Sequence, residues 1–145
     1  VFAMNRIEEV LSGDSSKQKQ PFLFSIDVQI FYTDLDFNYH LNQSVYGAKI
    51  ENALMQYDDA LYSCKYHVRD VSVHYVKAIR LDRMQNQTDR SLPVCVVKIV
   101  SDIVGNERDR EIVGVIEMHQ TVRAQFRVML VPYRHERLFA LRSRL

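Results

Sequence analysis

The 145-residue sequence has little of several features that mark specialised classes of protein. It contains four glycines and no glycine-rich loop of the kind that cradles a nucleotide phosphate. Its two cysteines, Cys64 and Cys95, lie far apart without metal-type spacing, which argues against a disulfide framework and a zinc site. No apolar run approaches the roughly 18 residues of a membrane span. The sequence therefore predicts reduced thiols, no metal or other cofactor and no membrane span.

The sequence also has no excess of positive or negative charge. Nineteen Lys and Arg residues balance eighteen Asp and Glu residues to a formal net charge of +1, so nucleic acid is not an expected partner. With 47% apolar residues the chain can build one core, and its length suits one domain. We expect a soluble intracellular, cytoplasmic protein with a flexible lead-in over 1–21, one domain over 22–131 and a basic, solvated tail over 132–145.

Hydrophobic periodicity predicts a strand followed by a helix. Residues 22–32 alternate apolar and polar side chains, the pattern of a half-buried strand. From 43 to 62 the apolar side chains recur on one helical face, and Asn42 or Ser44 is a candidate N-cap. The members of this stripe are Tyr46, Ile50, Ala53, Leu54, Tyr57 and Leu61.

Every strong signal after the helix indicates strand. Residues 71–75 alternate, Pro93 opens the apolar run VCVVKIVSDIV, and residues 111–131 form one long bent strand or two shorter ones. Gly105 followed by Asn106 predicts a turn, and the polar segment 80–92 a loop.

One long helix with a run of antiparallel strands predicts an α+β fold in which a curved antiparallel sheet wraps around a central helix. Such a small sheet has open edges, and a common way to cover them is pairing between copies of the chain. We therefore expect a homodimer or a dimer of dimers.

The most informative stretch is DLDFNYHLNQSVY, residues 34–46, which joins the first strand to the helix. It resembles the D-x-D-x-x-G-H-x-N-N-x-x-Y signature of hot-dog-fold thioesterases of the 4-hydroxybenzoyl-CoA thioesterase type. It resembles still more the D-L-D-x-N-x-H-V-N-N form of plant acyl-carrier-protein thioesterases. The order of elements over 22–131 is similar too. The resemblance implies the hot-dog fold and hydrolysis of acyl-CoA or acyl-carrier-protein thioesters, as in fatty acid metabolism.

The sequence departs from the family pattern at four positions. Tyr39 stands where members often have glycine, and Gln43 stands where they have a second asparagine. Plant members carry an acidic residue and a cysteine at positions that correspond here to Ala78 and Ile79. A cysteine nucleophile at that point is therefore excluded, and carboxylate chemistry remains.

The resemblance assigns the chemistry to Asp36, as general base or nucleophile, whereas Asp34 is expected to bond to the nearby backbone of a turn. An oxyanion would meet the backbone N–H groups of the helix N-terminus near Asn42 and Gln43. The remaining candidates are Asn38 and His40, which would orient Asp36 or water, and Tyr39 and Tyr46, which would border the substrate.

Two other functions stay open. Some hot-dog proteins hydrate or dehydrate acyl thioesters, but their Asp-x-x-x-x-His spacing is one residue longer than the interval from Asp36 to His40. A non-catalytic hot-dog protein that binds acyl chains or serves as a scaffold is the second alternative, because a fold does not confer activity. Acyl-CoA is favoured over acyl-carrier protein, since the sequence has no strongly basic run to dock an acidic carrier.

Overall fold

The computed structural model describes residues 22–62, 65–81 and 93–133. The expected lead-in over 1–21, Cys64, the predicted loop from 82 to 92 and the tail from 134 onward lie outside the described residues.

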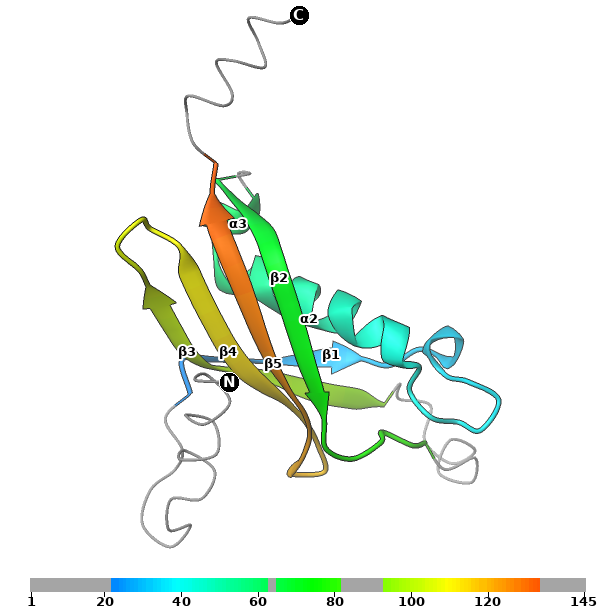
Figure 1. The fold of residues 1–145 in the computed structure, drawn as a ribbon. Coiled ribbons are helices and arrows are strands. Elements are labelled where there is room, and N and C mark those ends of the chain that lie inside the picture. Colours follow the sequence, from blue (N-terminus) through cyan, green and yellow to red (C-terminus); the bar gives the residue numbers. More distant parts are fainter. Residues whose placement is uncertain (1–21, 63–64, 82–92, 134–145) are drawn as a thin grey trace, which may run out of the picture.

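The strands form one antiparallel sheet, as predicted, and their order in the sheet is β1-β3-β4-β5-β2 (Figure 1). They are β1 (Phe24–Gln29), β2 (Tyr66–Tyr75), β3 (Val94–Val104), β4 (Arg110–Met118) and β5 (Thr121–Pro132). Strands β1 and β2 form the two edges. Most of β2 is exposed, whereas β4 at the centre is almost entirely buried.

The apolar stretch over 111–131 is two strands, β4 and β5, and not one bent strand. The chain reverses at His119 and Gln120, whose φ angles of 53° and 61° are both left-handed. Two successive left-handed residues make a tight hairpin turn that matches the twist of the strands. The predicted turn at Gly105 connects β3 to β4, where the Gly105 N–H donates to the Asp109 carbonyl at 2.7 Å.

Helix α2 (Gln43–Tyr57) lies against one face of the sheet (Figure 1). It is shorter than the predicted 43–62, because Asp58 has extended backbone angles and a short helix, α3 (Asp59–Tyr62), follows. The predicted stripe is confirmed on α2 from Tyr46 to Tyr57, and its last member, Leu61, packs against the core from α3. Its buried members Tyr46, Ile50, Ala53 and Leu54 join the apolar side chains of β3, β4 and β5 in one core. Removing such an apolar stripe from water is the main stabilising contribution to this layer.

Strand β1 is also shorter than the predicted 22–32. Phe22 and Tyr32 are 48% and 61% exposed, and a 3₁₀ turn, η1 (Tyr32–Asp34), follows the strand. The turn forms because the Asp34 carboxylate accepts the Phe31 N–H at 2.9 Å. It redirects the chain into the loop that leads to α2.

Candidate active site

The loop from Asp34 to Asn42 is held by backbone hydrogen bonds on two sides. Within the loop, the Asp36 N–H donates to the His40 carbonyl at 2.9 Å. Outside it, the Leu41 N–H donates to the Ile79 carbonyl at 2.7 Å, and the Leu81 N–H donates to the Tyr39 carbonyl at 2.9 Å. The loop is therefore fixed against the segment that follows β2.

The Asp36 carboxylate is oriented by the backbone of its own loop. Its Oδ1 accepts the Asn38 N–H at 2.8 Å and the His40 N–H at 3.1 Å. No described residue donates a hydrogen bond to Oδ2. One oxygen therefore fixes the carboxylate while the other stays available to water or to a substrate carbon.

Asp34 is tied to Lys49 on helix α2, a residue that sequence reasoning missed. Lys49 is 8% exposed, and its Nζ donates to Asp34 Oδ2 at 2.7 Å and to the Gln29 carbonyl at 2.8 Å. Burial alone would raise the pKa of Asp34, but the hydrogen bonds from Lys49 and Phe31 and the Lys49 charge outweigh it, so the pKa lies below its ordinary value. The available signal was position, since Lys49 lies three residues after Tyr46 on the apolar stripe.

The N-terminus of α2 meets the same loop. Asn42 is the N-cap, and its Oδ1 accepts the Ser44 N–H at 3.2 Å, which confirms one of the two predicted caps. Gln43 begins the helix, and its N–H makes no hydrogen bond to another described residue. A first helical N–H of this kind carries part of the positive end of the helix dipole.

A cavity of about 490 Å³ lies between the loop, the first turn of α2 and the end of β2. Five of the seven sequence candidates line it, and Asn38 and Tyr39 do not. The lining consists of Asp36, His40, Leu41, Asn42, Gln43, Tyr46, Tyr75, Val76, Lys77 and Ala78. The structure thus brings the candidate base and the helix N-terminus to one space. Asn38 and His40 hold Asp36 through backbone N–H groups and not through their side chains.

Tyr39 occupies the position where the related signature has glycine, with a left-handed φ of 60°. Glycine adopts this conformation without strain, whereas a residue with a Cβ does so at a cost of roughly 1–2 kcal/mol. The chain therefore keeps the backbone turn of the signature with a bulkier residue in it.

The aromatic wall of the cavity consists of Tyr46 and Tyr75, whose rings meet edge to face with centroids 5.0 Å apart. The Tyr75 hydroxyl also contacts the Gln43 carbonyl at 3.4 Å. Burial raises the pKa of Tyr46, against the opposing hydrogen bond of the Ile79 backbone. A neutral, buried phenol with an aromatic neighbour suits an apolar ligand.

Plant members of the family carry an acidic residue and a cysteine where this chain has Ala78 and Ile79. Neither Ala78 nor Ile79 has a side chain that could act as a nucleophile. Ala78 lines the cavity, and Ile79 is fully buried. Cys95 is buried in the core, where desolvation raises the pKa of its thiol to about 11. Because the thiolate is the nucleophilic form, Cys95 is inert at neutral pH.

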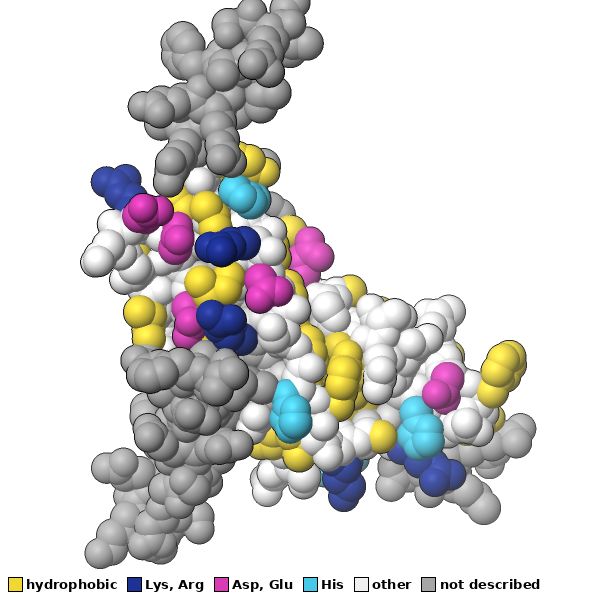
Figure 2. Space-filling model, viewed as in Figure 1, with side chains coloured by type: hydrophobic (Ala, Val, Ile, Leu, Met, Phe, Trp, Pro, Cys, Tyr) yellow, Lys and Arg dark blue, Asp and Glu magenta, His cyan; other side chains and the backbone are white. Residues whose placement is uncertain are grey.

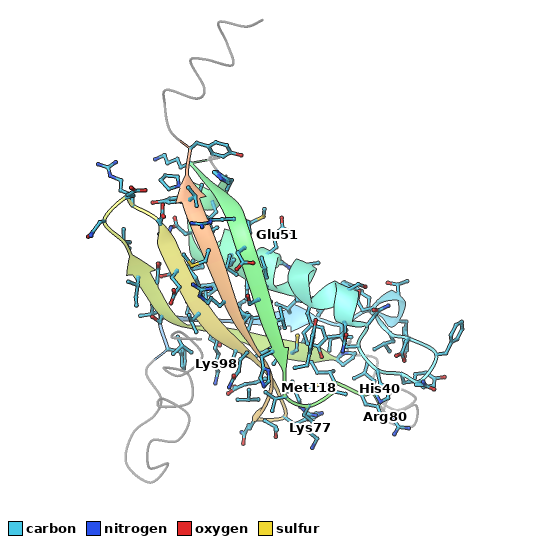
Figure 3. All side chains as sticks on the ribbon, in the orientation of Figure 1. His40, Glu51, Lys77, Arg80, Lys98 and Met118 are labelled. Atoms are coloured by element: carbon cyan, nitrogen blue, oxygen red, sulfur yellow. The ribbon has the colours of Figure 1, made fainter. Side chains whose placement is uncertain are left out.

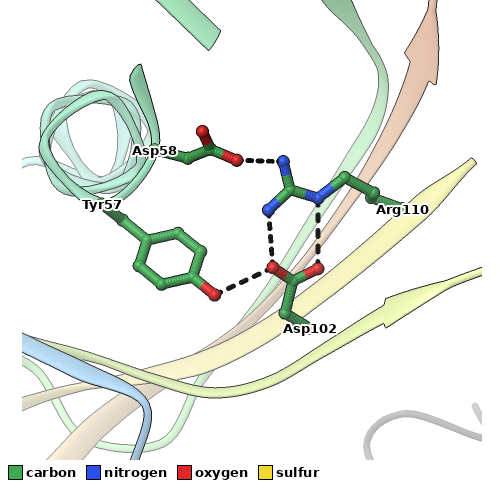
Figure 4. A network of polar contacts seen from close by, with 4 residues as sticks. All are labelled: Tyr57, Asp58, Asp102 and Arg110. Atoms are coloured by element: carbon green, nitrogen blue, oxygen red, sulfur yellow. Dashed lines mark hydrogen bonds and ion pairs between the residues drawn. The ribbon is translucent and has the colours of Figure 1, made fainter. Parts of the chain in front are cut away.

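A second polar cluster lies at the opposite end of α2 (Figure 4). Arg110, 7% exposed, donates from Nε to Asp102 Oδ1 at 3.2 Å and from its two terminal nitrogens to Asp102 and Asp58. The Tyr57 hydroxyl donates to Asp102 Oδ2 at 2.8 Å. Desolvation and this bond raise the pKa of Tyr57 to about 12. Sequence reasoning missed this cluster, whose members come from α2, β3, β4 and the helix break.

In the part of the chain that the structure describes, no three His, Cys, Asp or Glu side chains are grouped to hold a metal ion. None of the helices in this part of the chain is long and apolar enough to cross a membrane.

The chain was compared with known structures and curated proteins. A thioesterase from Thermus thermophilus, crystallised with coenzyme A and Zn, is 18% identical, with a TM-score of 0.64 over 79% of this chain and 87% of its own. A predicted thioesterase from Bacillus stearothermophilus is 14% identical, with a TM-score of 0.64 over 79% and 82% of the two chains. The 1,4-dihydroxy-2-naphthoyl-CoA thioesterase from Synechocystis is 8% identical, with a TM-score of 0.57 over 74% and 80%. No curated protein matches the sequence.

These likenesses establish the fold: a five-stranded antiparallel sheet with one long helix, the hot-dog fold that the motif implied. The family model described as acyl-ACP thioesterase C-terminal domain matches residues 15–126. The chain belongs to this family, within the hot-dog thioesterase superfamily.

Proposed function

We propose that the protein hydrolyses acyl thioesters to a free acid and a thiol, with Asp36 as general base or nucleophile. The observation that carries this proposal is the position of Asp36. Its carboxylate is oriented through Oδ1 alone and lines the same cavity as the first turn of α2.

As a general base, Asp36 takes a proton from water as the water oxygen attacks the thioester carbonyl carbon. As a nucleophile, its Oδ2 attacks the carbon directly, and water then hydrolyses the mixed anhydride. In both routes the tetrahedral intermediate collapses by breaking the carbon–sulfur bond, and the thiolate leaves and gains a proton.

The negative charge on the carbonyl oxygen would be stabilised at the N-terminus of α2. The Gln43 N–H is the candidate donor, since it begins the helix and makes no bond to another described residue, and Asn42 lies beside it on the cavity wall. One donor of this kind is worth about 10² to 10³ in turnover. His40 lines the same cavity and would orient water or the substrate.

The test is a panel of short, medium, long and aromatic acyl-CoA thioesters, together with an unsaturated member, assayed for free thiol and for double-bond hydration. Release of coenzyme A supports hydrolysis. Loss or migration of the double bond without thiol release would instead indicate a hydratase. Saturable binding without either reaction would leave an acyl-binding or scaffold protein.

We further propose that the protein is a homodimer or a dimer of dimers. Strand β2 is an edge of the sheet, and Val68, Val71 and Tyr75 on it are 52%, 45% and 41% exposed. An exposed apolar edge strand is a template for pairing with another chain. A monomeric mass by light scattering at micromolar concentration would contradict this proposal.

A further inference from the structure

The segment that leaves β2 carries two exposed cations beside the cavity. Lys77 lines the cavity itself, and the backbone of Arg80 forms a bridge with that of His40, another lining residue. Figure 3 shows Lys77, Arg80 and His40 along one edge of the molecule, next to the loop that holds Asp36.

These two cations differ from four others in the described part of the chain. Lys49, Lys98, Arg110 and Arg127 each form an ion pair with a carboxylate. Neither Lys77 nor Arg80 pairs with a described carboxylate. Exposed Lys65 and Arg69 likewise have no ion pair with a described carboxylate, but they do not line the cavity, so what distinguishes Lys77 and Arg80 is their position beside it. In Figure 2, acidic and basic side chains intermix over the upper part of the sheet, whereas basic and histidine side chains predominate along the lower edge.

Arg123, whose contacts include the cavity residue Ala78, is a cation with a structural role. Its guanidinium donates to the Ala78 carbonyl at 3.1 Å and to the Met118 carbonyl at 3.4 Å. It therefore ties the segment after β2 to the β4–β5 hairpin. Lys77 and Arg80 make no comparable contact with a described residue.

Two unpaired cations beside a cavity favour an anionic group on whatever enters it. A lysine offers a point charge and an arginine a planar fork, and both suit a phosphate. On the proposed function, the substrate's thiol portion is a pantetheine arm that bears a phosphate in coenzyme A and in acyl-carrier protein alike. We propose that Lys77 and Arg80 bind this 4′-phosphate while the thioester lies at Asp36.

The direct test compares two substrates that differ only in the phosphate, an acyl-phosphopantetheine and the corresponding acyl-pantetheine. The measured quantity is the ratio of their kcat/KM values. We expect the parent to prefer the phosphorylated substrate about tenfold or more, with most of the difference in KM, and the preference to shrink as salt is raised.

Three variants assign this preference to residues. Lys77→Gln and Arg80→Gln should each lower the ratio about threefold to tenfold, and the double variant should remove most of it. Lys65→Gln is the matched control, since Lys65 is also exposed but lies before β2, about 30 Å of strand away. The control should keep the parental ratio. A parent without preference, or a double variant that keeps it, would overturn the proposal.

A binding measurement with the pantetheine arm alone, without an acyl group, tests this inference independently of the proposed hydrolysis. Calorimetry with phosphopantetheine and pantetheine needs no turnover. If neither substrate is hydrolysed, but phosphopantetheine binds more tightly and the double variant loses that difference, the phosphate site stands and the hydrolase proposal fails. Calorimetry with acyl-CoA and with acyl-carrier protein then identifies the source of the phosphate, as the one for which the double substitution raises the dissociation constant more.

Discussion

The two ends of helix α2 carry similar types of residue, but those at one end are hydrogen-bonded to one another and Asp36 at the other end keeps one oxygen unbonded to any described residue. At its C-terminal end, both oxygens of Asp102 accept hydrogen bonds, and Arg110 is buried between two carboxylates (Figure 4). At its N-terminal end, Asp36 uses one oxygen and lines an open cavity. Both clusters place carboxylates near a tyrosine, so residue type alone does not separate a structural cluster from a candidate site.

The difference lies in what remains unpaired. Buried polar groups stabilise a fold when every donor and acceptor is used, because an unpaired buried group costs the free energy of its lost hydration. A catalytic group must keep one atom free and must stay in reach of solvent. The Arg110 cluster meets the first description and Asp36 the second. Substitutions at the two ends should therefore have different effects on turnover and stability.

The largest effect is expected from Asp36→Asn. The amide retains an oxygen for the Asn38 and His40 N–H groups but loses the charge that activates water or attacks the carbonyl. Turnover of the best acyl thioester should fall by about two to four orders of magnitude, the range for lost acid–base catalysis. The melting temperature should hardly change.

His40→Ala should have an intermediate effect and is compared with Asp36→Asn. Its side chain lines the cavity, but its contact with Asp36 comes from the backbone, which alanine keeps. Turnover should therefore fall less than in Asp36→Asn. An Asp36→Asn variant that is folded and hydrolyses as fast as the parent would mean that the loop only binds and caps.

At the other end of the helix, Arg110→Met should lower the free energy of unfolding and have no direct effect on turnover. Removal of the guanidinium breaks the ion pairs with Asp102 and Asp58, and the loss of one partner from a buried pair costs about 3–5 kcal/mol. Urea denaturation measures this loss as a lower midpoint. At a temperature where the variant is folded, its kcat should stay near the parental value.

Arg127→Met is the control for Arg110→Met. Arg127 pairs with Glu111 at 3.2 Å, but both side chains keep about a quarter of their exposure. A pair of this kind contributes about 0–1 kcal/mol. If the two variants lost equal stability, burial of the Arg110 cluster would not be the cause.

The strand and helix patterns were sufficient to predict the fold, because each reflects local burial. The stripe from Tyr46 to Tyr57 and the run after Pro93 lie as expected, whereas Leu61 lies on the separate helix α3. The hairpin at His119 and Gln120 could not be distinguished from a bent strand, since neither residue is a glycine that would announce a left-handed turn. The early ends of β1 and α2 precede Asp34, which bonds to the Phe31 N–H, and Asp58, which has extended backbone angles, and the apolar pattern records neither.

The site was predictable only where its residues are consecutive. The motif from Asp34 to Tyr46 contains six cavity residues, five of which were candidates from the sequence, whereas Lys77 and Ala78 come to the cavity through the sheet. Basic residues that are scattered in the sequence also gave no docking signal, although the fold brings Lys77 and Arg80 beside the loop. Contacts of this kind depend on topology, which a linear pattern does not record.

A smaller effect is expected from Lys49→Met, which removes the cation that binds Asp34 at the start of the loop from Asp34 to Asn42. Loss of the charged bonds to Asp34 and Gln29 should lower the free energy of unfolding by about 1.5–3 kcal/mol at pH 7. Turnover should change less than in Asp36→Asn, because Lys49 contacts Asp34 and not the candidate base.

The pH dependence of this difference gives a second measurement. Because the folded protein holds the pKa of Asp34 below its ordinary value, the stabilisation is present above that value and is lost as the pH falls through the folded pKa. The stability gap between parent and Lys49→Met should therefore narrow in acid. A gap that stays constant below about pH 4, the ordinary range of an aspartate, would assign the loss to packing of the lysine stem instead.

The smallest effect is expected from Tyr39→Gly, which restores the residue of the related signature at a left-handed position. Relief of strain at φ 60° favours glycine by roughly 1–2 kcal/mol, but glycine also gains about 0.5–1 kcal/mol of freedom in the unfolded chain. The net change should lie between no change and a stabilisation of about 1.5 kcal/mol. Tyr39→Ala is the matched control, since it removes the same ring and keeps the strain, so it should be less stable than Tyr39→Gly by thermal melting. Because Tyr39 does not line the cavity, both variants should keep turnover within a few-fold of the parent. A large gain in turnover in both variants would show that the ring obstructs the substrate, whereas a gain in Tyr39→Gly alone would assign the effect to the backbone of the loop.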